Sequence, residues 1–341
     1  MRAPPAAGRS ARRSAGRVLG GIGLLALAML ARQAAAACTG AETGGGLGSV
    51  PSQRVIAGPA VTGLGNFHLD CPGVLLAALS APPTLRATIV GTANGRLLKD
   101  PVSGFTIPYQ LTGSNGSNGS TVYTDGLAAI NFSGTTAVGL FTAGRATLPV
   151  NIATTGTPNV PAGTYEDVLT VQWTYTNLCQ ALVSVGGLCA VQLLPTVVLA
   201  PLASGTVNRT LRISLTVTND CTIAAPNIAF GTAPLPSGFP SLSQAIRLTC
   251  TRSMQYTVGI GPGTNAAGGR RQMAAGGNRL AYDIFKADNS VWGTATGTRS
   301  AAALADGINV QTIPYTARIY PDQPAPPVGD YADNVVVDVQ F

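Results

Sequence analysis

The clearest alternation of apolar and polar positions lies at the end of the chain, in residues 331–341. Val335, Val337, Val339 and Phe341 alternate there with mostly polar neighbours. A strand places successive side chains on opposite faces, so this pattern gives one uniformly apolar face. We therefore expect a strand that packs on a hydrophobic core.

The turn that precedes this strand occurs twice in the chain. Residues 161–167 and residues 327–333 both read P-x-G-x-Y-x-D, and each copy leads into an alternating run. After the first copy a further apolar run follows at 191–202, which we expect to be the next strand of the same domain. No such run follows the second copy. The repeat therefore predicts two related domains, the second of which lacks its last strand.

The rest of the chain consists of short alternating runs separated by Gly, Pro and Asn, and no long segment has the helical period of 3.6. This pattern predicts an all-β protein with two immunoglobulin-like β-sandwich domains. We place the first domain at 38–202 and the second at 203–341. The alternating run at 211–217 is then expected to open the second domain.

Residues 1–37 have the features of a secretory signal peptide. Several arginines precede an apolar segment at 18–30, and Ala35 to Ala37 offer a cleavage site. An apolar segment of this length is short for a membrane anchor. Cys38 follows the cleavage site, which is the arrangement of a lipoprotein, but Ala35 stands where such signals carry a leucine-type residue. The sequence therefore predicts export.

Export changes the interpretation of the charge. The signal segment carries six of the 21 Lys and Arg residues and no acidic residue, which leaves 15 basic residues against 14 acidic ones. The mature chain is thus close to neutral, and only 10% of all residues are charged. No basic patch remains that would indicate nucleic-acid binding.

All six cysteines lie in the exported part, where disulfides are the expected state. Six cysteines allow 15 connectivities. The division into domains favours three pairs: Cys38 with Cys71, Cys179 with Cys189, and Cys221 with Cys250. The competing interpretation is a metal site, but the chain has a single histidine, His68, and no C-x-x-C pair. We expect neither a metal nor a cofactor.

Enzymatic activity finds little support in the sequence. His68 would have to serve any nucleophile, and no G-x-S-x-G motif is present. The only glutamates are Glu42 and Glu166, and Glu166 lies in the repeated turn. The Gly-rich run at 261–277 lacks the Lys-Ser/Thr ending of a phosphate-binding loop. The sequence therefore predicts a binding or structural protein.

The second half resembles a known family through many residues in the same order. They are Thr216-Val217-x-x-x-Cys221, Ala229-Phe230-Gly231, Leu248-x-Cys250, Arg271-x-Met273, Leu280-x-Tyr282-x-Ile284-Phe285, Asp288, Trp292-Gly293 and Gly329-x-Tyr331-x-Asp333. This pattern is similar to the spore coat protein U domain, a family that consists largely of subunits of archaic, Csu-type chaperone-usher pili. The first half shares the repeated turn and Ile107-Pro108-Tyr109, but it lacks the Trp-Gly pair.

The resemblance implies a function for the missing strand. A sandwich without its last strand leaves an apolar groove and unpaired backbone groups, which a strand from another chain can complete. The expected partners are a periplasmic pilus chaperone, an outer-membrane usher and a neighbouring subunit that donates a strand. Val335, Val337, Val339 and Phe341 are expected on the strand beside this groove. The alternative is that residues 331–341 complete an ordinary sandwich.

A two-domain member of this family resembles a tip adhesin subunit, exposed on the cell surface and involved in attachment and biofilm formation. A shaft subunit would need a free, alternating segment at its mature N-terminus to donate as a strand. Residues 38–46 are instead Gly-rich and start with a cysteine expected to be in a disulfide. We therefore expect a subunit that accepts a strand without donating one. A shaft subunit is the alternative.

The surface that such a tip would contact is expected in the loop between Cys179 and Cys189. Its apolar residues are Leu182, Val183, Val185 and Leu188. If exposed, they would form an apolar patch suited to an abiotic or host surface. Residues 74–79 are a second apolar run, which we interpret as a core strand, and a core strand is also the alternative for the apolar residues of the loop. A secreted glycan-binding module is a further alternative, although no aromatic and carboxylate cluster marks a sugar site.

Overall fold

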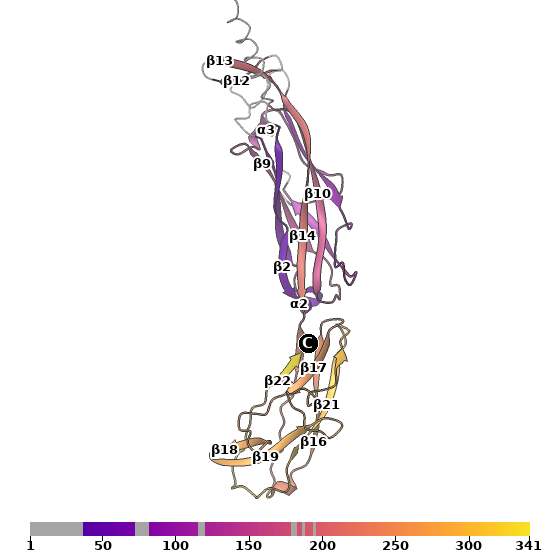
Figure 1. The fold of residues 1–341 in the computed structure, drawn as a ribbon, viewed down its shortest axis with the longest axis vertical. Helices are drawn as coiled ribbons and strands as arrows, with labels where there is room; N and C mark the ends of the chain where they lie inside the picture. Colours follow the sequence, from indigo (N-terminus) through magenta and orange to yellow (C-terminus); the bar gives the residue numbers. More distant parts are fainter. Residues whose placement is uncertain (1–36, 72–81, 115–119, 179–182, 186–187, 194–195) are drawn as a thin grey trace, which may run out of the picture.

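The computed structural model describes residues 37–71, 82–114, 120–178, 183–185, 188–193 and 196–341. Almost all regular structure in these ranges is β-strand, as the alternation predicted. Two separate hydrophobic cores divide the chain into two domains, which lie end to end (Figure 1). No helix in the described ranges is long and apolar enough to cross a membrane.

The first domain is a sandwich of two layers. One layer is antiparallel, and its strands in spatial order are β1 (Thr39–Gly44), β3 (Thr62–Asp70), β9 (Arg145–Thr154), β6 (Thr106–Gly113) and β7 (Thr121–Val122). The other layer contains β2 (Gly46–Pro51), β14 (Ala203–Thr218), β10 (Gly163–Leu178), β4 (Thr84–Thr92) and β8 (Ala128–Ser133). The short strand β5 (Leu97–Lys99) pairs with β6 and β10 and joins the two layers.

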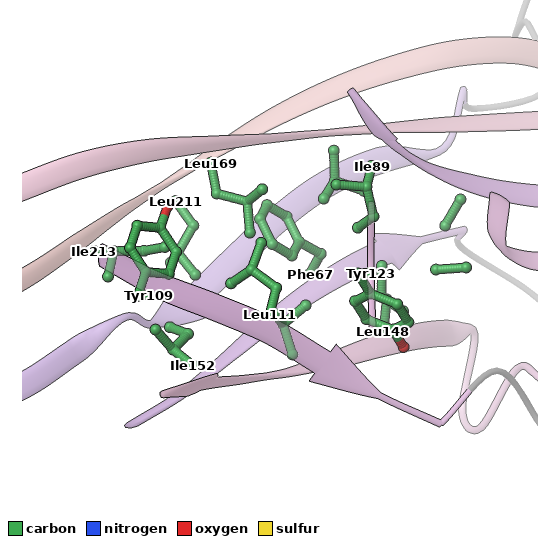
Figure 2. Close-up of a cluster of buried hydrophobic side chains, with 14 of the residues drawn as sticks. Phe67, Ile89, Tyr109, Leu111, Tyr123, Leu148, Ile152, Leu169, Leu211 and Ile213 are labelled. Carbon is green, nitrogen blue, oxygen red and sulfur yellow. The ribbon is translucent and has the colours of Figure 1, made fainter. Parts of the chain in front are cut away.

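Apolar side chains from alternate positions of both layers fill the space between them. Figure 2 shows this core, in which Phe67, Leu111 and Leu148 from the first layer meet Leu169 and Ile213 from the second. All five side chains are fully buried. Two short helices of six residues, α2 (Ser52–Ala57) and α3 (Gly134–Gly139), contribute Val55 and Ala137 to the same core.

The chain crosses from one layer to the other between its first two strands, β1 and β2. β1 pairs with β3, and β2 then runs parallel to β14. The crossing requires Gly44 and Gly45, which have φ angles of +86° and +91°. A Cβ atom on either residue would lie 2.3 Å from a backbone oxygen, that of Leu64 or of Arg212. Only glycine fits both the angle and the space.

The N-terminal end of β1 is fixed in the first domain. Cys38 forms a disulfide with Cys71, and its backbone N–H donates a hydrogen bond of 3.1 Å to Tyr175 Oη. The second domain contains the corresponding disulfide between Cys221 and Cys250. These are two of the three expected pairs. The third expected pair, between Cys179 and Cys189, lies outside the described residues because it involves Cys179.

The expectation for the end of the first domain was wrong. Residues 191–202 do not supply the strand beside β10. They contribute to β12 (Leu188–Leu193) and β13 (Thr196–Pro201), which form a small separate sheet with β11 (Val183–Val185). The strand beside β10 is β14, whose Leu211, Ile213, Leu215 and Val217 are buried in the first core. The domain boundary therefore lies after Thr218 and not at 202.

The second domain is also built from two sheets. Its larger sheet has the order β15 (Cys221–Ala224), β16 (Leu242–Cys250), β21 (Gln311–Ile319), β19 (Asn278–Phe285) and β18 (Arg271–Ala275). Its smaller sheet has the order β20 (Ala303–Leu304), β17 (Gln255–Ile260) and β22 (Val337–Gln340). A single 3-10 turn, η1 (Pro236–Gly238), precedes β16.

The two domains contact each other around a short linker of two residues, Asn219 and Asp220. Thr251 makes two hydrogen bonds to the backbone of the linker residue Asp220. Its N–H donates to Asp220 O at 2.9 Å, and its hydroxyl accepts from Asp220 N at 2.7 Å. The same hydroxyl lies 2.6 Å from Ser52 Oγ of the first domain, and both side chains are fully buried. The guanidinium of Arg252 stacks on the ring of Phe105.

Candidate binding groove in the second domain

The second domain contains a groove of about 350 Å³ between the ends of its two sheets. One contributing segment, residues 225–230, continues from the edge strand β15. The other, residues 331–337, leads into the edge strand β22. The floor is formed by apolar and aromatic side chains from the intervening strands, namely Ile246, Ile260, Met273, Tyr282, Ile284 and Tyr315.

Both strands at the groove have an open edge. β15 ends the larger sheet and β22 ends the smaller one, and β22 pairs with β17 alone among the strands that the structure describes. Backbone N–H and C=O groups beside an apolar groove need partners, and natural proteins seldom leave such an edge uncovered. The groove therefore has the shape and chemistry to accept one more strand.

The two P-x-G-x-Y-x-D turns have the same internal hydrogen bond. Tyr165 donates from its hydroxyl to Pro161 O at 2.7 Å, and Tyr331 donates to Pro327 O, also at 2.7 Å. This is the tyrosine corner seen in immunoglobulin-like sandwiches, where it lies at the start of the next-to-last strand. β10 and β22 therefore occupy corresponding places in their domains.

The aspartates of the two turns also have corresponding partners. Asp167 accepts a hydrogen bond from Tyr109 Oη at 2.9 Å, and Asp333 accepts one from Tyr282 Oη at 2.9 Å. Burial, together with the bond to Asp333, raises the pKa of Tyr282 well above its ordinary value, so its hydroxyl stays a proton donor. The correspondence between the domains thus extends to the side chains around the turn.

The strands after the two turns differ in how they are covered. β10 pairs with β14 from Gly163↔Val217 to Leu178↔Ala203, and Leu169, Val171 and Trp173 are fully buried. In the second domain the place of β14 beside β22 is empty among the described residues. The matching residues, Val335, Val337 and Val339, are only partly buried. The same alternation is therefore covered in one domain and uncovered in the other.

The predicted strand residues do not all have the same environment. Val335 and Val337 line the groove, and Val339 packs against the second core. Phe341 is 68% exposed and lies one residue beyond the end of β22. The corresponding residue of the first domain, Tyr175, is covered because it pairs with Gly205 of β14. Phe341 has no such neighbouring strand in the part of the chain that is described.

A buried ion pair supports the floor of the groove. Arg271 Nη1 lies 2.8 Å from Asp283 Oδ1, and both side chains are at least 96% buried. The other N–H groups of the Arg271 guanidinium donate to the carbonyl oxygens of Ile260, Gly261 and Trp292. Ile260 and Met273 both belong to the floor of the groove but lie in different sheets, β17 and β18. Arg271 therefore connects the two sheets beneath the groove.

A second ion pair holds β22 against β17. Arg299 Nη1 lies 2.8 Å from Asp338 Oδ2, and Arg299 also donates to Thr257 O at 3.0 Å. Gly259 leaves room for this pair, because a Cβ atom there would lie 2.5 Å from Arg299 Nη1 and the guanidinium would have to shift. β22 is thus fixed on one side while its other side stays open.

Sequence reasoning missed one wall of the groove. Residues 225–230 have no regular secondary structure, yet Ile228 and Phe230 pack against the second core. Their spacing of two residues is a weak strand signal, and Pro226 lies just before it. Of the floor residues, Met273, Tyr282 and Ile284 belong to the pattern of the family resemblance, and the sequence assigned none of the six to a groove.

The residues predicted to contact a surface lie in the small sheet. Val183 and Val185 are in β11 and Leu188 is in β12, whereas Leu182 lies outside the described residues. The run at 74–79 also lies outside them. The small sheet is at the end of the molecule that is farthest from the second domain (Figure 1). Within the described ranges, no group of acidic, histidine and cysteine side chains is arranged to hold a metal ion.

Comparisons with known proteins agree with this architecture. The family model described as Spore Coat Protein U domain matches residues 25–172 and 207–338. A chain from the CsuC–CsuE chaperone–tip adhesion subunit pre-assembly complex of Acinetobacter baumannii Csu pili is 24% identical, with a TM-score of 0.55. The match covers 88% of this chain and 100% of that one, and it shows a shared fold.

A weaker likeness is to the CupB6 tip adhesin of Pseudomonas aeruginosa, at 11% identity and a TM-score of 0.33. That match covers 89% of this chain and 94% of the other. No curated protein sequence matches the chain.

Proposed function

The chain belongs to the Spore Coat Protein U domain family, and on that basis we propose that it is the tip subunit of an extracellular chaperone-usher pilus. In this role the second domain joins the subunit to the fibre and the first domain attaches the fibre to a surface. The subunit passes through the periplasm before it reaches the cell exterior. The shared fold with a chain of a chaperone–tip adhesion subunit complex supports this proposal.

The observation that carries the proposal is the open groove beside β22. In the first domain the corresponding position is filled by β14. A strand from another protein can fill it in the second domain, with its backbone completing the sheet and its apolar side chains entering the groove. A periplasmic chaperone would supply this strand before assembly at the outer-membrane usher, and a neighbouring subunit would supply it in the fibre.

The first domain supports a place at the end of the fibre. The residues that a shaft subunit would extend towards its neighbour are here part of the domain itself, because residues 39–51 form β1 and β2. Removing them would expose β14, and the disulfide between Cys38 and Cys71 holds their N-terminal end in the domain. The subunit therefore accepts a strand and has no segment in this region to donate.

The small distal sheet supports an adhesive role for the other end. Val183, Val185 and Leu188 belong to its strands β11 and β12, and the sheet lies at the end of the molecule farthest from the second domain (Figure 1). An exposed apolar patch at such an end suits contact with a hydrophobic surface. We propose that these residues bind a surface of this kind.

Changing Val183 and Val185 to aspartate should abolish attachment. Two buried valines contribute about 3 kcal/mol or more, so attachment of piliated cells to a hydrophobic surface should fall on the order of 100-fold. Val102→Asp is the control, since Val102 is 93% exposed and lies outside the small sheet. Surface pili should be equally abundant in all variants. Unchanged attachment by the double variant would remove this sheet as the contact, and inhibition by a soluble glycan would favour the lectin alternative.

A further inference from the structure

β14 connects the two ends of the molecule directly. The small distal sheet ends at Pro201, β14 spans Ala203–Thr218, and the second domain begins at Cys221. Figure 1 shows that β14 runs the whole length of the first domain between these points. Only Leu202 precedes it, and only Asn219 and Asp220 follow it. A single strand therefore joins the distal sheet to the second domain.

This strand is already close to its greatest possible length. A strand rises about 3.3 Å per residue, which gives roughly 53 Å for the 16 residues of β14. A fully stretched chain reaches about 3.6 Å per residue, or roughly 58 Å. Pulling the two ends of β14 apart can therefore lengthen it by only about 5 Å.

β14 is also held along the length of one edge, along part of the other edge and on its inner face. It pairs antiparallel with β10 from Ala203 to Val217, and its end from Ser214 to Thr218 pairs parallel with β2. Leu211, Ile213 and Leu215 are at most 3% exposed in the first core. The strand thus has sideways support from the sandwich, while tension along it is carried by covalent bonds.

We propose that β14 transmits tension through the subunit and thereby protects the first domain from unfolding under force. This inference rests on the proposed function, because tension arises when the distal sheet is attached and the second domain is held in a fibre. The force then passes from the distal sheet along β14 to Asp220. The strands β1 to β10 precede the distal sheet in the chain and are outside this path.

Two pulling geometries test the proposal in the full-length chain. Handles are attached through side chains introduced at Leu202 and Ile223, so that tension acts along β14. In the control geometry the handles are at Val102, which is 93% exposed, and Ile223, so that tension acts across the core strands. The force is set as the one at which the chain between the control handles lengthens by several hundred Å, which is the length expected when about 120 residues unfold. The same force is then applied to both geometries.

Trypsin reports whether β14 stays in the sheet. Arg209 and Arg212 are the only trypsin sites between residues 202 and 223, and a protease cuts a strand only when it leaves the sheet. At the chosen force, cleavage with handles at 202 and 223 should stay within about twofold of the unloaded rate. In the control it should rise at least about tenfold. Equal acceleration in both geometries would overturn the proposal.

The test separates this inference from the proposed function. It uses neither a surface nor a neighbouring subunit, so its outcome does not depend on adhesion or on assembly. Loss of the tension-transmitting role would leave the groove and the distal contact as proposed. If the valine variants attach normally, the proposed surface contact is wrong, but the trypsin experiment still tests whether β14 carries tension.

Discussion

We expect the Arg271→Met variant to lose about 3–5 kcal/mol of the stability of the second domain, the largest effect of any single substitution considered. The change leaves Asp283 charged, buried and without its partner, apart from a hydrogen bond of 2.8 Å from Tyr320 Oη. It also removes the donors to three backbone carbonyl oxygens. Calorimetry should show the unfolding temperature of this domain falling by about 10 °C or more.

Two further variants separate the causes of this loss. Arg270→Met changes the neighbouring residue, which has an exposed ion pair of 3.9 Å with Asp322 and stacks on the ring of Tyr320, and should cost about 1 kcal/mol. Combining Arg271→Met with Asp283→Leu removes both buried charges and should recover part of the lost stability. A single Arg271→Met variant as stable as the unchanged protein would contradict the role given to this ion pair.

The second large effect is expected from Val337→Asp. Val337 lines the groove, so a carboxylate there would meet the apolar side of an incoming strand and lose its hydration. Binding of a chaperone or donor strand should weaken by about 2 kcal/mol or more, roughly 30-fold, and pili should not incorporate the subunit.

Val336 provides the matched control for this experiment. It is the preceding residue in the same segment, has the same side chain and is 71% exposed. Val336→Asp should change binding by less than about 0.5 kcal/mol. The affinity for a donor-strand peptide, measured by calorimetric titration, separates the two variants. Equal binding by both would show that an incoming strand does not use the groove.

The sequence predicted the parts of the fold that depend on local pattern. Alternation identified the strand at the chain end, and the repeated turn predicted that β10 and β22 correspond. Both conclusions depend on residues close together in the chain, such as Tyr331 and Pro327, whose hydrogen bond spans four residues. Patterns of this kind follow from strand geometry and turn chemistry alone.

Pairing between distant strands could not be predicted in the same way. The alternation of Leu211, Ile213, Leu215 and Val217 marks a strand but does not say which sheet it joins. β14 reaches β10 only after the excursion through β11, β12 and β13, and this excursion led to the wrong domain boundary. The groove wall at 225–230 was missed for a related reason, since it is irregular and acquires its role only from the missing strand.

The central claim is that the second domain lacks one strand, and calorimetry of a strand-completed chain tests it most directly. A short turn and a copy of residues 205–218 are appended after Phe341, which reproduces the antiparallel pairing of β14 with β10 without the excursion through β11, β12 and β13. In the control, serine replaces the apolar residues of the copy that correspond to Leu211, Ile213 and Leu215. Both chains are compared with the protein that carries no extension.

We predict that the apolar extension raises the unfolding temperature of the second domain by about 10 °C or more, because three buried side chains contribute several kcal/mol. The serine control should leave that temperature unchanged, and neither extension should affect the first domain. Equal unfolding temperatures for the apolar and serine extensions would contradict the account, because the second domain would then be complete without another strand.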